Sequence, residues 1–228
     1  MPLILLGLLL ALLVFAPQWW ARYTFRRYAT PRPNITGTGG ELARHLLDRF
    51  GMAEVKVETT QPGGDHYDPR TRTVRLSPDN HDQRSLTAVA VAAHEVGHAI
   101  QHHLDDPRLA LRTRMVTLAQ SAQQLGAAAM VVLPFAVAIT RAPGLGVLMF
   151  LLGLFSMGMA TVVHFITLPV EVDASFNKAL PILREGYIGP EDEVAVRRIL
   201  RAAAYTYVAA SLASLLNIGR WIAMLRRA

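Results

Sequence analysis

The stretch Val91–His103 carries four histidines within ten residues, with Glu95 directly after the first of them. On an α-helix, residues four apart lie about 40° apart around the axis and one turn apart along it, so His94 and His98 can reach one ion. Glu95 lies about 100° round from His94 and can contact a water on that ion without taking a ligand position. This H-E-x-x-H spacing predicts two zinc ligands and a general base.

The chemistry that this pattern predicts is peptide hydrolysis. Zinc polarises the scissile carbonyl and lowers the pKa of its water, and Glu95 takes the proton and later delivers it to the leaving amine. Glycine costs about 1 kcal/mol in a helix interior relative to alanine, so Gly97 predicts that something packs close to the helix backbone. The alternative is that His94 and His98 are core histidines. His102 continues the stripe, but we expect it at the surface.

Two histidines leave a catalytic zinc short of one protein ligand, and the chain has no cysteine to supply it. Glu171 is the best candidate, because we expect it to begin a helix just after a long apolar segment. A carboxylate at a helix N-terminus is also favoured by the helix dipole alone, which is the competing explanation. We expect Asp173 to bond a ligand imidazole. His102 and His164 are the next candidates for the third ligand.

A small sheet is expected before the histidine helix. Val55–Glu58 and Thr73–Leu76 alternate like strands, with turn signals between them, and predict an antiparallel pair. Within Asp65–Pro69, His66 and Tyr67 are candidates for stabilising the oxyanion of a tetrahedral intermediate. The alternative is that Asp65–Pro69 forms an ordered turn.

Two helices are expected around these strands. Glu41–Phe50 has helical apolar spacing and ends at Gly51. The histidine helix should run from about Leu86 to about Leu104, capped by Asp82 or Ser85 and stopped by the Asp-Asp-Pro that follows.

Apolar residues are abundant over the whole chain, at 52% hydrophobic and 18% charged residues. We therefore expect a mainly α membrane protein, with transmembrane helices plus a small zincin-like α+β catalytic unit. The expected regions are a transmembrane anchor at 1–21, a cytoplasmic catalytic region at 22–124, a transmembrane hairpin at 125–168, a third-ligand helical region at 169–201 and a C-terminal transmembrane or interfacial helix at 202–228.

The net charge of +6 comes mainly from arginine-rich flanks of the apolar segments. Arg22, Arg26, Arg27 and Arg32 follow the first segment, and by the positive-inside rule they place the catalytic region in the cytoplasm. The competing explanation, nucleic-acid binding, has no visible motif to support it, so no nucleic-acid partner is expected.

The chain resembles the YugP-like neutral zinc metallopeptidases of bacterial membranes. The resemblance covers nearly the whole chain in order and rests on Asp65–Pro69, Val74–Ser77, Val91–Gln101, Leu168–Ser175 and Ala203–Ala210. It implies a membrane-embedded zinc endopeptidase of the gluzincin kind, with His94, His98 and Glu171 as ligands and Glu95 as base. The family often has Glu-Phe-Asn-Ala-Ser at the segment that begins with Glu171, so the resemblance gives Asp173 no defined role.

The expected location is the bacterial inner membrane, crossed several times, with the active site facing the cytoplasm. The expected partners are the lipid bilayer and a polypeptide or membrane-protein substrate, and the oligomeric state is not predicted. The main alternative is a non-catalytic zinc-binding membrane scaffold or chaperone partner. Glu95 separates the two, because a structural zinc site needs no base at that position.

Overall fold

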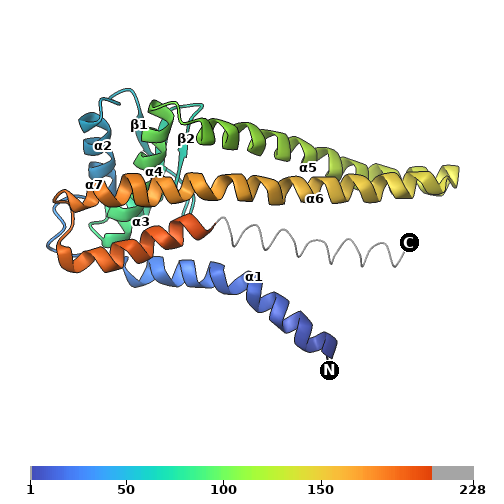
Figure 1. The fold of residues 1–228 in the computed structure, drawn as a ribbon, viewed down its shortest axis with the longest axis horizontal. Coiled ribbons are helices and arrows are strands. Elements are labelled where there is room, and N and C mark those ends of the chain that lie inside the picture. Colours follow the sequence, from blue (N-terminus) through green and yellow to red (C-terminus); the bar gives the residue numbers. More distant parts are fainter. Residues whose placement is uncertain (1, 207–228) are drawn as a thin grey trace. The chain divides into compact units, whose positions relative to one another are not determined.

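The computed structural model describes residues 2–206 and divides them into two units. The first unit contains residues 2–15 and 111–167, and the second contains residues 16–110 and 168–206. Three long helices each contribute to both units: α1 (Pro2–Arg27), α5 (Pro107–Thr140) and α6 (Pro143–Val172). Figure 1 shows these helices along the chain.

The first unit consists of the early part of α1 and most of α5 and α6. The turn between α5 and α6 uses Arg141 in the left-handed region, at φ 52°. Large apolar side chains stay exposed along both helices, including Phe135 at 69% and Phe155 at 60% exposure. Among the side chains that the structure describes in these two helices, many large apolar ones are therefore exposed.

The transmembrane part of the expected fold is wrong. Across residues 2–206, none of the helices combines the length and the apolar character that crossing a membrane requires. A span needs about 20 predominantly apolar residues in one helix. The apolar runs instead belong to helices that also carry polar residues, such as Arg22 in α1 and Arg112 and Gln120 in α5. The predicted C-terminal helix at 202–228 lies largely outside the described residues.

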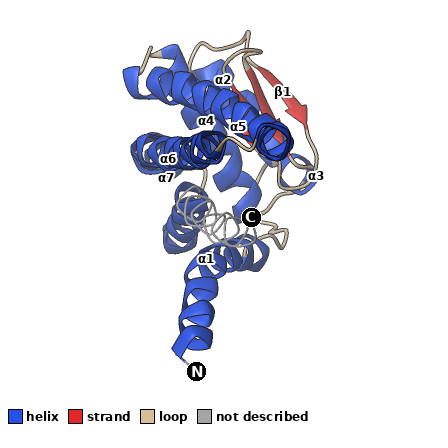
Figure 2. Ribbon diagram, turned by 90° about the vertical axis from the view of Figure 1, so that its right-hand side faces the viewer, coloured by secondary structure: helices blue, strands red, loops and turns tan. Residues whose placement is uncertain are grey.

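The mainly helical character and the small sheet are confirmed, with one correction to the sheet. Its strands, drawn in red in Figure 2, are β1 (Lys56–Thr59), β2 (His66–Asp68) and β3 (Thr73–Leu76). Their order in the sheet is β1-β3-β2. β1 and β3 pair in parallel, not antiparallel as expected, and β2 pairs antiparallel with β3. The connection between β1 and β3 contains β2, which gives the chain the length it needs to return in the same direction.

The helices before the site begin at capping residues that the sequence supplies. Helix α2 (Gly39–Arg49) starts with a capping box between Thr38 and Glu41. Helix α3 (Pro78–Asp82) is short, and α4 (Leu86–His103) begins at Ser85, whose side chain accepts from the Ala88 backbone N–H. The predicted bounds of α2 and α4 are therefore confirmed to within about two residues.

The second half of the second unit is a series of helical segments. A π-helix, η1 (Asp173–Ala179), continues directly from α6, and α7 (Leu180–Arg184) continues from η1. The 3-10 turn η2 (Pro190–Asp192) leads into a helix at residues 193–206. Of these segments, η1 and α7 contact α4.

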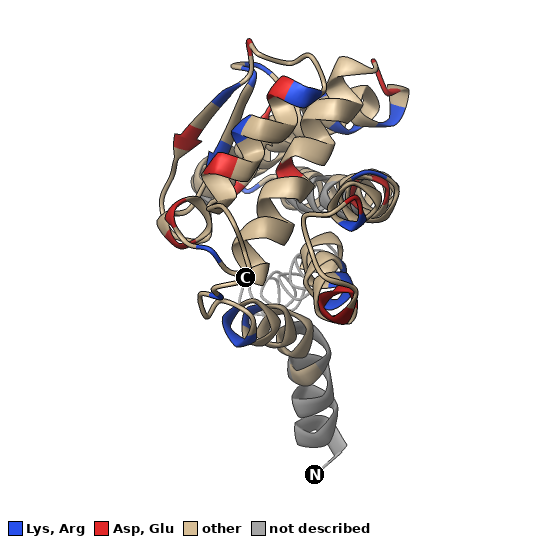
Figure 3. Ribbon diagram, turned by 90° about the vertical axis from the view of Figure 1, so that its left-hand side faces the viewer, with Lys and Arg blue, Asp and Glu red and all other residues tan. Residues whose placement is uncertain are grey.

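Helix α4 lies at the centre of the second unit. Every residue from Leu86 to Gln101 is buried, and α4 contacts α2, α3, β2, β3, η1 and α7. On the surface of this unit, Lys and Arg are interspersed with Asp and Glu (Figure 3), for example in the Arg49–Glu185 ion pair at 2.6 Å. Exposed ion pairs contribute about 0–1 kcal/mol each, so the apolar core around α4 supplies most of the stability.

Candidate metal centre

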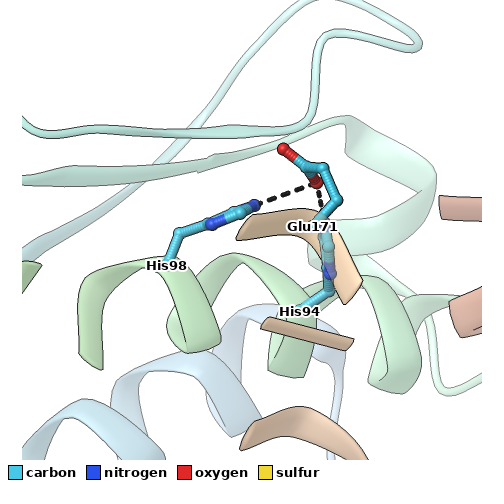
Figure 4. A group of neighbouring side chains, drawn as sticks. All are labelled: His94, His98 and Glu171. Atoms are coloured by element: carbon cyan, nitrogen blue, oxygen red, sulfur yellow. Dashed lines mark hydrogen bonds and ion pairs between the residues drawn. The ribbon is translucent and has the colours of Figure 1, made fainter. Parts of the chain in front are cut away.

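Three buried side chains converge in the second unit. His94 Nε2 and His98 Nε2 each lie 3.2 Å from Glu171 Oε2. Figure 4 shows both imidazoles projecting from α4 toward the Glu171 carboxylate. All three side chains are nearly inaccessible to solvent, with Glu171 at 0% exposure. The predicted ligand residues are thus brought together, although 73 residues separate His98 from Glu171.

Close packing between the backbones of α4 and η1 brings Glu171 to the two histidines. A Cβ added at Gly97 would lie 2.8 Å from the Ala174 carbonyl oxygen, so only glycine allows η1 to approach α4 this closely. The expectation that something packs against the backbone at Gly97 is confirmed. The prediction that Glu171 begins a helix is wrong. Glu171 lies in the last turn of α6, before the π-helix. Single π-helical turns inside helices are frequent at functional sites.

The donor set fits a tetrahedral zinc ion. Ligand atoms about 2.0–2.1 Å from a tetrahedral centre are separated by about 3.3 Å, which is close to the 3.2 Å between each Nε2 and Glu171 Oε2. Two imidazole nitrogens and one carboxylate oxygen are also the ligand types that catalytic zinc uses. The three groups form a cluster that could hold a metal ion.

The electrostatics of the cluster keep its carboxylate charged. Burial raises the pKa of Glu171, but the nearby His98 and His94 imidazoles outweigh it and hold that pKa well below its ordinary value. For Asp173, burial likewise raises the pKa, and hydrogen bonds from Asn177 and Gln101 lower it to below the ordinary value. The carboxylates of Glu171 and Asp173 therefore both carry negative charge, which suits a bound cation.

The sequence suggested that Asp173 bonds a ligand imidazole, but the contact is indirect. Its Oδ2 accepts a hydrogen bond of 2.8 Å from Gln101 Nε2, and Gln101 Oε1 lies 2.9 Å from His98 Nδ1. On the other histidine, Ser175 Oγ lies 3.0 Å from His94 Nδ1. Sequence reasoning missed Gln101 and Ser175. Their spacing could have identified them: Gln101 is three residues after His98, and Ser175 is four residues after Glu171. This spacing puts each of them near the ligand face of its helix.

Glu95 and the two oxyanion candidates occupy different environments. Glu95 is buried in the same helical turn as His94, at 6% exposure. Tyr67 is buried on β2, and its hydroxyl lies 2.8 Å from Nδ1 of His102 on α4. Burial raises the pKa of Tyr67 to about 12, so the hydroxyl stays protonated. His66 is exposed, with Nδ1 2.7 Å from the Gly64 carbonyl oxygen, so only Tyr67 faces α4.

Comparison with known proteins gives one family and one relative. The model of a family described as "Putative neutral zinc metallopeptidase" matches residues 3–226. The chain is 35% identical over 224 residues to the Bacillus subtilis (strain 168) protein named "Putative membrane protease YugP", covering 96% of each chain. No solved structure matches the chain.

Proposed function

The chain belongs to the neutral zinc metallopeptidase family, and we propose that it hydrolyses peptide bonds at the His94, His98 and Glu171 centre with Glu95 as the general base. The observation that carries this proposal is the convergence of two imidazole nitrogens from the buried helix α4 with one carboxylate oxygen from α6, where Glu95 directly follows His94 in the sequence of α4. The substrate class is polypeptide.

The residues of the site have two roles: three of them hold the metal, and Glu95 transfers a proton. Nε2 of His94, Nε2 of His98 and Oε2 of Glu171 hold the zinc ion, which when bound lowers the pKa of a water and polarises a carbonyl. The Glu95 carboxylate accepts a proton from the attacking water and delivers it to the nitrogen of the leaving amine. The apolar residues around α4 exclude bulk water from these groups, which strengthens their electrostatic interactions.

Substitution of Glu95 tests the proposal. Glu95→Gln keeps the shape of the side chain but removes the base, so peptide hydrolysis should fall by about 10²- to 10⁴-fold while zinc content stays at the wild-type level. The measurement is cleavage of casein beside zinc content of the purified full chain. Glu54→Gln, at an exposed position in the same unit, is the matched control and should behave like wild type. Activity of Glu95→Gln within tenfold of wild type contradicts the proposed role.

We also propose that the chain works in association with a membrane. The Bacillus subtilis relative is named a putative membrane protease, and large apolar side chains are exposed along α5 and α6, such as Phe135 and Phe155. Exposed apolar surface of this kind is a common mark of protein or membrane contact. Fractionation tests this: the full chain should stay with the membrane pellet after a high-salt wash, and recovery in the supernatant contradicts it.

A further inference from the structure

Each histidine of the cluster has one ring nitrogen facing Glu171 and the other facing a buried polar side chain. His98 Nδ1 lies 2.9 Å from Gln101 Oε1, and His94 Nδ1 lies 3.0 Å from Ser175 Oγ. Gln101 is 1% exposed and Ser175 is 0% exposed, so water does not compete for these contacts. The protonation of each ring is therefore set by what its partner can accept or donate.

The partners of Gln101 fix its amide in one orientation. Its Nε2 donates to the Val170 carbonyl oxygen at 2.9 Å and to Asp173 Oδ2 at 2.8 Å, and both of these oxygens can only accept. A flipped amide would place its oxygen against two acceptors and leave them unsatisfied. Gln101 Oε1 must therefore face His98, and as an acceptor it requires the ring proton to be on Nδ1.

The charges around Asp173 strengthen this arrangement. Asp173 also accepts from Asn177 Nδ2 at 2.9 Å, and Arg108 and Lys178 lie 3.7 Å and 3.6 Å from its carboxylate oxygens. These groups keep the carboxylate charged and in place, so that it holds the Gln101 amide. Asp173 acts on His98 through Gln101.

Ser175 fixes the other histidine by a different route. Its hydroxyl donates to the Leu200 carbonyl oxygen at 3.2 Å, and a serine hydroxyl has only one proton to donate. With that proton directed to Leu200, its oxygen accepts from His94, and the proton of that ring lies on Nδ1. Leu200 belongs to the helix at residues 193–206, so that helix sets the position of Ser175.

We infer that Gln101 and Ser175 are positioning residues that hold both imidazoles in the Nδ1–H tautomer, so that both Nε2 lone pairs face the metal. With both protons on Nδ1, the two Nε2 lone pairs and the Glu171 carboxylate form a three-atom donor set for a cation, which takes the place of the hydrogen bonds between the rings and the carboxylate. The inference rests on the metal centre of the proposed function, but it does not depend on Glu95 or on catalysis.

The test uses zinc affinity and the ring nitrogens of the full chain. Ser175→Ala and Gln101→Met remove the acceptors with little change in volume, and each should lower zinc affinity by about 10- to 100-fold in a chelator competition. The zinc-induced rise in unfolding temperature should shrink in both variants, whereas a purely structural loss would lower that temperature equally with and without zinc. Ser121→Ala and Gln61→Met are matched controls, and Ser121 also donates to a backbone carbonyl, that of Thr117.

The wild-type protein offers a readout that needs no variant. The ¹⁵N spectrum of the zinc-loaded chain with labelled histidine should show two rings bound through Nε2 and protonated at Nδ1. A ring bound through Nδ1, or wild-type zinc affinity in both variants, overturns the inference. If Glu95→Gln remains active while these results hold, the proposed catalytic role fails and the tautomer assignment stands.

Discussion

Helices α4 and α5 are both rich in apolar residues, but they use them in opposite ways. In α4, Leu86 to Gln101 are buried, and apolar neighbours enclose two histidines and a glutamate. In α5, Leu125, Phe135 and Ile139 are 69%, 69% and 83% exposed. Apolar composition alone therefore does not say what a helix contacts. In α4, tertiary packing turns an apolar helix into a low-dielectric environment in which charged groups interact strongly.

The largest expected difference between these helices is the cost of truncating a leucine. Leu86→Ala removes a fully buried side chain from α4 and should lower the free energy of unfolding by about 2–5 kcal/mol. Leu118→Ala, at 54% exposure in α5, should change it by less than about 0.5 kcal/mol. Denaturant unfolding of the two variants measures both values. If Leu118→Ala lowered the free energy of unfolding as much as Leu86→Ala does, Leu118 would be packed in the folded molecule. The proposed difference between α4 and α5 would then be wrong.

A smaller difference is expected from adding one methyl group to a glycine. Gly97→Ala in α4 forces a Cβ to within 2.8 Å of the Ala174 carbonyl oxygen, which should cost about 1–3 kcal/mol and weaken zinc binding by moving η1. Gly146→Ala in α6 meets no atom within 4 Å and should be neutral or stabilising by up to about 1 kcal/mol. Unfolding and zinc titration of both variants test this, and unchanged zinc affinity in Gly97→Ala would refute the role given to the close approach.

The smallest expected effect is a pH dependence at the surface of the second unit. Hydrogen bonds from Arg184 and Arg197 lower the pKa of Glu193 to about 2. Because the folded pKa lies below the unfolded one, the stabilisation is complete above about pH 4.5 and is lost as the pH falls toward 2. The unfolding temperatures of wild type and Glu193→Gln should therefore differ most near neutral pH and converge near pH 2 to 3. A difference in unfolding temperature that grows as the pH falls would contradict the lowered pKa of Glu193.

Local signals in the sequence were enough to predict the central helix and its contents. Ser85 as the cap of α4, the strand at Thr73–Leu76 and the close contact at Gly97 all follow from residue type and spacing within a few positions. Glu171 could be proposed from its place after an apolar segment, but its position in a continuous helix depends on how α6 runs into η1.

Long-range contacts account for what the sequence did not predict. The parallel pairing of β1 and β3 depends on β2, whose His66–Asp68 resembles a turn because it is short and flanked by turn residues. Gln101 and Ser175 are ordinary polar residues until packing brings Asp173 and Leu200 to them.

We propose that His94, His98 and Glu171 together form one zinc centre. Zinc K-edge X-ray absorption of the purified full chain and of Glu171→Ala tests it most directly. The wild-type spectrum should show only nitrogen and oxygen neighbours at about 2.0–2.2 Å, two of them from imidazoles, and Glu171→Ala should bind markedly less zinc. Wild-type zinc content and an unchanged spectrum in Glu171→Ala would contradict the claim.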